Sequence, residues 1–250
     1  MSASLAWRAE EACLNAWPGL RYVVHGDWIA RFGEGLSRRA NSVSPLREDA
    51  QGLVERLDAF AALYRTHGLP LIVRVPTLLD PAIDRHLAQA GFSAEGETCT
   101  PYGAMDAVTA QHDAAVSFSD EPDAPWLDAF NTFHGRDPRE RVIFQRIVRV
   151  IALRTAFVML REQGVIASVA MGALHDGLLC IESVITSAQY RGQGHGRRML
   201  GALSAWARDH GATGVCLQVE ASNAPGLALY HRLGLRTELS RYHYRRAPNR

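Results

Sequence analysis

The sequence lacks the marks of a disulfide-stabilised, secreted or membrane-spanning protein. Its 250 residues include four cysteines that are far apart and form no CxxC pair: Cys13, Cys99, Cys180 and Cys216. We interpret them as reduced core residues rather than as a disulfide framework or a zinc site. The N-terminal segment contains acidic residues and no apolar h-region, which argues against a signal peptide. No apolar run approaches the roughly 20 residues of a membrane span, so we expect a cytoplasmic protein without a bound metal.

Charge of one sign is not in excess either. The chain has 27 basic and 26 acidic residues, which leave a formal net charge of +1 at pH 7. Global charge therefore indicates neither a nucleic-acid partner nor a membrane surface. Apolar residues make up 47% and charged residues 21% of the chain, which is typical of a globular protein with a substantial core. The length is compatible with one large domain or two small ones.

Strand and helix patterns alternate along the chain, which indicates an α/β protein built of two lobes. Residues 4–17 have a helical pattern, and further strands and helices follow in the first half. A polar, proline-bearing stretch at 109–125 then interrupts the pattern. We therefore place one lobe at residues 1–112 and a second lobe at residues 113–250.

The second half begins with helical patterns and continues with three strands up to residue 186. The strands are joined at Gln163-Gly164 and Asp176-Gly177, and dipeptides of the Asp-Gly type favour hairpin turns. A glycine-rich turn and a helix at 196–209 come next. A strand, a second helix and a final strand complete the pattern.

The stretch "YRGQGHGRRM", residues 190–199, carries glycine at 192, 194 and 196. Each glycine costs conformational entropy on folding, so three together suggest that a ligand approaches the main chain closely. A helix N-terminus presents free N–H groups and a partial positive charge, for which phosphate is a natural partner. We predict a diphosphate site here; a tight connection without a ligand is the alternative. The GxGxxG spacing is broken and no Gly-Lys-Ser/Thr follows, which excludes dinucleotide and nucleoside-triphosphate loops.

Two motifs together resemble the GNAT superfamily of N-acetyltransferases. Residues 191–196 match its signature Arg/Gln-x-x-Gly-x-Gly/Ala in full. The segment "VEASNAPGLALYHRLGL" resembles a second signature, which it matches at Asn223, Tyr230 and Gly234, with Leu235 in place of the usual phenylalanine. The resemblance covers about residues 115–247. It implies an α/β fold of tandem GNAT-like lobes, each a mixed, mostly antiparallel sheet flanked by helices, with a degenerate first lobe.

The resemblance also implies acetyl-CoA as the acyl-donor substrate, and no metal. The diphosphate would lie on main-chain amides of the glycine turn, and the pantetheine arm would pair with the strand before it. The implied acetyl-CoA contacts are Val184, Thr186, Arg191, Gly192, Gln193, Gly194, His195, Gly196, Arg197 and Asn223. Amides placed in this way would stabilise the oxyanion of a tetrahedral intermediate.

Amine attack on a thioester needs a base for the amine proton and an acid for the departing thiolate. Tyr230 matches the usual acid of the family, with a core tyrosine as the alternative. Glu182 is the first candidate base, because a carboxylate inside the apolar run "LLCIESVI" needs an explanation. It could instead be solvated or paired with an arginine; Glu220 is the second candidate. Period-two counting predicts one strand face for Cys180, Glu182, Val184 and Thr186.

Two basic segments have no role in these motifs. The cluster of Arg38, Arg39 and Asn41 could read a carboxylate on the acceptor by bidentate pairing, or it could tie the two lobes together. The basic end of the chain, residues 241–250, could meet the 3′-phosphate of CoA or form a frayed terminus.

We therefore predict an acetyl-CoA-dependent N-acetyltransferase that modifies the primary amine of a small molecule or amino acid by direct attack in a ternary complex. The expected partner is that amine, without nucleic acid or membrane, and a homodimer is left open. Two other functions stay open: a non-catalytic acyl-CoA sensor or scaffold, and a protein-lysine acetyltransferase. Thiol release with an amine panel separates the sensor from the enzyme.

Overall fold

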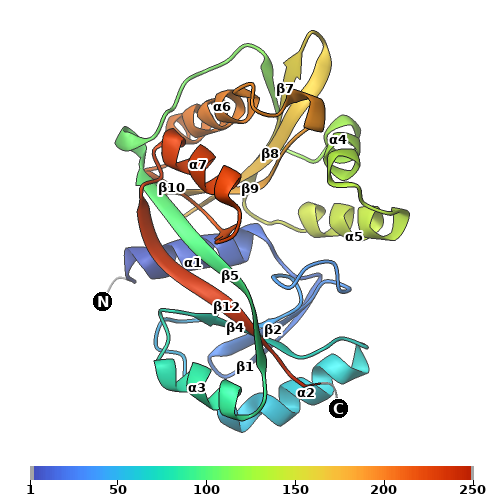
Figure 1. Ribbon diagram of the computed structural model, residues 1–250, viewed down its shortest axis with the longest axis vertical. Coiled ribbons are helices and arrows are strands. Elements are labelled where there is room, and N and C mark those ends of the chain that lie inside the picture. Colours follow the sequence, from blue (N-terminus) through green and yellow to red (C-terminus); the bar gives the residue numbers. More distant parts are fainter. Residues whose placement is uncertain (1–2, 249–250) are drawn as a thin grey trace.

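The computed structural model describes residues 3–248, and Figure 1 shows one twisted sheet that runs through both halves of the chain. The strands are β1 (Arg21–His25), β2 (Trp28–Phe32), β3 (Val43–Pro45), β4 (Ile72–Pro76), β5 (Ser93–Ala104), β6 (Val116–Ser119), β7 (Arg154–Glu162), β8 (Val165–His175), β9 (Leu178–Thr186), β10 (Gly214–Leu217), β11 (Val219–Glu220) and β12 (Thr237–Arg246). The α-helices are α1 (Leu5–Ala16), α2 (Leu57–Thr66), α3 (Pro81–Gln89), α4 (Ala124–His134), α5 (Pro138–Arg149), α6 (His195–Asp209) and α7 (Ala224–Leu233). Across residues 3–248, no helix combines the length and the apolar character that crossing a membrane requires.

The two halves of the chain exchange strands at the centre of the sheet. The strand order is β1-β2-β3-β4-β12-β5-β10-β9-β8-β7-β6, and β11 lies beside β5. Pairing is antiparallel except between β3 and β4 and between β9 and β10. β5 of the first half pairs with β10, whereas β12 of the second half pairs with both β4 and β5. The mixed, mostly antiparallel α/β fold is confirmed. The division at residue 112 stays a prediction, and a cut there would separate β5 from all three strands that pair with it.

The turn residues recognised in the sequence set the register of the second half. Asp176 and Gly177 have φ angles of 46° and 74°, and Gln163 and Gly164 have φ angles of 49° and 82°. Positive φ at both central residues matches the twist of a two-residue hairpin, and these turns join β7 to β8 and β8 to β9. Both predicted hairpins are confirmed. The helix predicted at 196–209 is present as α6.

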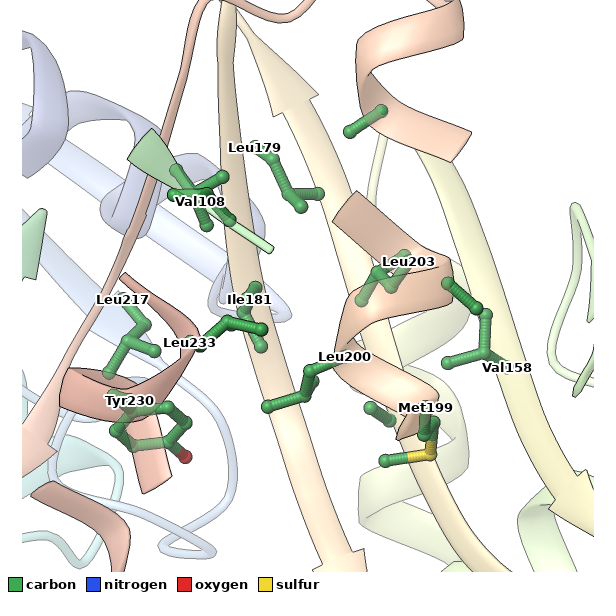
Figure 2. Close-up of a cluster of buried hydrophobic side chains, with 14 of the residues drawn as sticks. Val108, Val158, Leu179, Ile181, Met199, Leu200, Leu203, Leu217, Tyr230 and Leu233 are labelled. Atoms are coloured by element: carbon green, nitrogen blue, oxygen red, sulfur yellow. The ribbon is translucent and has the colours of Figure 1, made fainter. Parts of the chain in front are cut away.

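Helices cover the two faces of the sheet, and β9 is enclosed between them. α6 and α7 pack on the face that carries Leu179 and Ile181; Figure 2 shows this cluster, with Tyr230 of α7 at one end. α1 packs on the opposite face, against Cys180. α4 and α5 cover that same face nearer to β7, around Phe157. Because successive strand residues point to opposite faces, β9 contributes side chains to both layers.

The end of the chain is a strand of the sheet as far as Arg246. β12 pairs along one edge with β4 and along the other with β5, and Tyr242 and Tyr244 are both buried. The predicted frayed end is therefore wrong up to Arg246, because pairing on both edges satisfies the main chain and buries these rings. Residues 249 and 250 lie outside the described residues. Figure 1 shows this end of the chain far from α6.

Candidate active site

The central opening in the sheet lies between β9 and β11. β9 and β10 pair in parallel only up to Ile181 opposite Leu217. β9 then continues to Thr186 beside β8, whereas β11 turns away to pair with β5 through Val219 and Glu220. Beyond Ile181, the structure records no strand paired with this edge of β9 within residues 3–248. An extended ligand could therefore pair with the main chain here, as an added strand does.

A β-bulge at Ser183 reverses the side-chain phase along this edge. Ser183 has a φ of 54°, and the register with β8 shifts between Glu182 and Ile185. As a result, Val184 packs against the core beneath α6 and α7, while Glu182 stays on the face of Cys180. One extra residue breaks the period of two. The single face predicted for Cys180, Glu182, Val184 and Thr186 is therefore wrong beyond Glu182.

Backbone conformation requires two of the three glycines in the turn, and it does not require the third. Gly192 and Gly194 have φ angles of 75° and 84°, a left-handed conformation that favours glycine with or without a ligand. Gly196 has no such requirement: a methyl group there would meet only Leu229 at 3.4 Å and Thr186 at 3.6 Å. Gly196 is therefore the position at which the lack of a side chain best indicates a close ligand.

The main-chain amides at the start of α6 point out of the helix without intrahelical acceptors, as at any helix N-terminus. Gly194 is the N-cap and provides no side-chain acceptor, and the amide of Arg198 is the first to donate within the helix, to Gly194 O at 3.1 Å. The turn itself is held by side chains. Arg191 Nε donates to Thr186 O at 3.1 Å, and Gln193 Nε2 donates to Gln189 O at 2.9 Å.

The remaining predicted acetyl-CoA residues take different positions. His195 is buried and packs edge-on against Tyr190, with ring centroids 5.5 Å apart. Arg197 is exposed on the first turn of α6. Asn223 caps α7, because its Oδ1 accepts from Gly226 N at 3.0 Å. These positions hold the turn and α7 in shape, and the acetyl-CoA contacts themselves stay predictions.

A cavity of about 470 Å³ lies beside the opening in the sheet. The predicted residues that line it are Glu182, Val184, Glu220, Asn223 and Tyr230. Three walls surround them: the loop from Leu36 to Arg39 of the first half, the end of α4 with the residues after it, and α7. The structure therefore brings together all three candidate catalytic residues. Residues 191–197 lie further along the chain from Val184 and do not line this cavity.

Glu182 is the enclosed carboxylate of the cavity. It is 4% exposed, and both of its oxygens bind Arg39, at 2.5 Å from Nη1 and 2.8 Å from Nη2. Burial raises the pKa of Glu182 above its usual value, while the charge of Arg39 and its hydrogen bond act in the opposite direction. Arg39 also lies over the ring of Trp17, 5.0 Å from its centroid. The arginine-paired alternative for Glu182 is thus what the structure shows, and it fixes the carboxylate in place.

Glu220 is the exposed counterpart. It binds Arg38 at 3.0 Å, and its side chain is 57% exposed. Asn41, the third residue of the predicted carboxylate reader, is buried; its Oδ1 accepts from Gly33 N and Gly35 N at 2.8 and 3.0 Å. The cluster therefore ties the first half to the two candidate carboxylates and shapes its own loop.

Tyr230 enters the cavity from α7. Its side chain is 9% exposed, and burial, followed by the charge of Glu182, raises its pKa to about 12. The hydroxyl therefore stays protonated throughout the neutral range. It is available as a hydrogen-bond or proton donor to a group in the cavity.

The α4 side of the cavity contains residues that the sequence did not single out. Phe130, His134 and Arg136 line it, and none of them belongs to a recognisable motif. Their only sequence sign is a helix that ends in "FHGR". Because this wall is assembled from a helix end and a loop, its position depends on how α4 packs against β9 and not on local spacing.

A cluster of three thiols was also not predicted, because its residues are far apart in the sequence. Cys13, Cys180 and Cys216 come from α1, β9 and β10, and their sulfur atoms lie within 4.8 Å of one another. Thiols can hold soft metals, but these three are buried in a layer rich in the alanines of α1. Their packing fits the interpretation as small core residues, and the lack of a metal stays a prediction.

The opening between parallel strands, the bulge and the bare helix N-terminus define a GNAT-type acyltransferase fold. A family model described as "Probable histone acetyltransferase Rv0428c C-terminal" matches residues 6–246, and the chain belongs to this family. That single model spans both halves of the chain. The structure is thus a member of the GNAT superfamily of N-acetyltransferases, as the two motifs suggested.

Known proteins resemble the chain over its whole length. It is 25% identical over 243 residues to YobR of Bacillus subtilis strain 168, described as an uncharacterized N-acetyltransferase; the match covers 95% of this chain and 97% of YobR. A GCN5-related N-acetyltransferase from Kribbella flavida has a TM-score of 0.72 at 15% identity and covers 98% of this chain and 95% of its own. A tandem GNAT protein of the clavulanic acid biosynthesis pathway has a TM-score of 0.61 at 15% identity, with coverages of 84% and 76%. The two structures show the fold.

Proposed function

We propose that the protein transfers an acetyl group from acetyl-CoA to the amine of a small molecule by direct attack. The observation that carries this proposal is the free edge of β9 beyond Ile181, with a cavity on one side that holds Glu182 and Tyr230. The bare amides of α6 follow on the same chain segment. Together they suit a long thioester that pairs with the strand and rests its diphosphate on the helix N-terminus.

The residues of the cavity supply the two proton movements. Glu182 takes the amine proton. A water molecule passes the proton on if both carboxylate oxygens stay bound to Arg39. The amine nitrogen then attacks the thioester carbonyl. The C–S bond breaks, and Tyr230, which is protonated at neutral pH, donates to the departing sulfur. Glu182 is the preferred base over Glu220 because it is enclosed and fixed beside Tyr230, whereas Glu220 is largely solvated.

The acceptor is proposed to be an amine of moderate basicity. An α-amine has a pKa near 8, so deprotonation at neutral pH costs about 1 kcal/mol, whereas a lysine amine near 10.4 costs about 4–5 kcal/mol. The pairing with Arg39 offsets part of the basicity that burial gives Glu182, which favours the first class.

The description of the matching family gives a second candidate function, transfer to a protein lysine such as that of a histone. The chain itself contains no lysine. Acetyl-lysine detected after incubation with acetyl-CoA and histone peptides would therefore come from the peptide alone. Turnover of peptides at rates above those of every small amine would favour this second candidate.

The acetyl-CoA site is tested at Gly196. Alanine fits the fold there and improves helix propensity by up to about 1 kcal/mol. We therefore expect Gly196→Ala to keep or raise the melting temperature while the affinity for CoA, measured by calorimetry, falls at least tenfold. Thiol release from acetyl-CoA in the presence of an amine panel should fall with it.

Gly201→Ala is the matched control. It lies in the same helix, and its added methyl would have ordinary contacts, 3.8 Å from Thr109. It should bind CoA as the natural protein does. Equal CoA affinity in both variants would contradict the proposed site, and CoA binding without thiol release for any amine or peptide would instead indicate a sensor.

A further inference from the structure

The link between α4 and α5 holds one arginine in a fixed position at the cavity. Gly135 ends α4 with a φ of 70°, and the amide of Arg136 donates to Asn131 O at 3.0 Å. Arg136 O accepts from Arg141 Nε at 3.1 Å, and the next residue, Asp137, is the N-cap of α5 and forms a capping box. The main chain is thus tied on both sides of Arg136, which places its side chain against the cavity with little freedom.

The guanidinium of Arg136 is stacked on aromatic rings. It lies over Phe144 and Phe130, 4.0 and 4.8 Å from the ring centroids. Burial lowers the pKa of Arg136 to about 10, so the group stays charged at neutral pH. Within residues 3–248 the structure records no ion pair for it, and its Nη1 is sealed from solvent without a hydrogen-bond partner. A charge held in this way is incompletely satisfied by the protein.

The other charges of the cavity cannot serve this arginine. Arg39 occupies both oxygens of Glu182, and Arg38 binds Glu220. The lining therefore contains three arginines, at 38, 39 and 136, and two carboxylates that are already paired. Glu140 acts on Arg136 through its charge, but its carboxylate accepts from Asp137 N and does not line the cavity. The lining thus carries one more positive than negative charge, which an anion brought in by a ligand would compensate.

The position of Arg136 points to the acceptor rather than to the acyl donor. The diphosphate of acetyl-CoA is expected at α6, and α6 and α7 cover one face of the sheet. α4 and α5 belong to the layer on the opposite face. The acyl donor and Arg136 thus approach the proposed reacting centre from different layers. The acceptor is therefore the substrate that would lie on the α4 side of the cavity, next to Arg136.

We infer that Arg136 binds a carboxylate on the amine acceptor, so that the acceptor class is amino acids and related amines that carry a carboxylate. This inference rests on the proposed acetyl transfer. A planar guanidinium matches a carboxylate with two parallel hydrogen bonds, and Arg136 lines the cavity. Arg38 and Arg39, which the sequence offered for this role, are the arginines that hold the candidate bases.

The test compares acceptors that differ only at the carboxylate. Rates are measured for a panel of amino acids and for their carboxamides, with the natural protein and with Arg136→Gln and Arg136→Lys. For each protein, the rate with an amino acid is divided by the rate with its carboxamide. Because this ratio is compared between the natural protein and the variants, differences in amine reactivity cancel. We expect Arg136→Gln to lower kcat/KM for the amino acids about 100-fold, mainly through KM, and to leave the carboxamides within about threefold. For Arg136→Lys, kcat/KM for the amino acids should lie between the values for the natural protein and Arg136→Gln.

Arg139→Gln is the control for loss of one positive charge, since Arg139 lies on the exposed surface of α5; it should leave both panels unchanged. Binding of N-acetyl amino acids, followed by their thermal stabilisation of the protein, gives a readout that needs no turnover. Stabilisation by the acids and not by their amides, lost in Arg136→Gln, is the expected result. Equal losses for acids and amides in Arg136→Gln, or no preference for acids in the natural protein, would overturn the inference while the acetyl transfer stands. Failure to bind CoA would count against the transfer instead.

Discussion

Two consecutive arginines form ion pairs at the same cavity, and the two pairs differ in burial and in geometry. Arg38 and Arg39 belong to the same loop of the first half, and each binds a carboxylate of the second half. The Arg39–Glu182 pair is bidentate, with side chains 24% and 4% exposed; the Arg38–Glu220 pair has one contact, with side chains 35% and 57% exposed. The buried pair holds its carboxylate in the cavity lining, while the exposed one adds little to stability.

The difference teaches what the first half contributes to the activity. Its sheet supplies β5 to the strands of the second half, and its loop holds the carboxylate of Glu182 through Arg39. The first half therefore lines the candidate site. Its descent from a degenerate copy of the second half stays a prediction.

Stability should separate the two pairs most strongly. Arg39→Met leaves the carboxylate of Glu182 buried without its counter-charge, and removal of one partner of a buried pair costs about 3 kcal/mol or more. Arg38→Met should cost less than about 1 kcal/mol, because the pair is exposed. Chemical denaturation measures both free energies of unfolding. Equal effects would show that burial does not distinguish the pairs.

Turnover should separate the carboxylates next. Glu182→Gln removes the proposed base and should lower kcat about 100-fold, near the lower limit for general acid–base catalysis. Glu220→Gln should change kcat less than about fivefold, since its side chain is mostly solvated. CoA affinity should be equal in both variants, which calorimetry can check. A larger loss in Glu220→Gln would assign the base to Glu220.

The pH profile gives the finest distinction. Activity needs ionised Glu182, so kcat/KM should fall as the pH drops through its pKa, which lies above the usual value for glutamate. Arg39 lowers that pKa, so in Arg39→Gln the acidic limb should move to higher pH, by about one unit. Arg38→Gln should leave the limb in place. A limb that does not move with Arg39 would show that another group titrates.

Part of the site could be predicted because its chemistry depends on residues adjacent in the chain. The left-handed backbone at Gly192 and Gly194, the capped start of α7 at Asn223 and the hairpin turns all follow from local conformational preference. Tyr230 follows from the resemblance to the second signature of the family, which lies on one helix with that cap. Such features can be predicted from the sequence because residues close together in the chain determine them.

Other parts depended on contacts across the chain. The bulge at Ser183 has no sequence sign, and it reversed the face predicted for Val184. The partners of Arg38 and Arg39 lie 182 and 143 residues away, and Cys13 lies 167 residues from Cys180. Spacing along the chain carries no information on such pairs.

The sequence by itself determined the alternation of strands and helices, the glycine turn and the motif that names the superfamily, because all of these rest on period, turn chemistry and short spacing. Only the tertiary structure decided that β5 and β12 cross between the halves, that Glu182 is held by Arg39, and that Arg136 faces the cavity unpaired. Those features arise from burial and from charges brought together by folding, which no local pattern encodes.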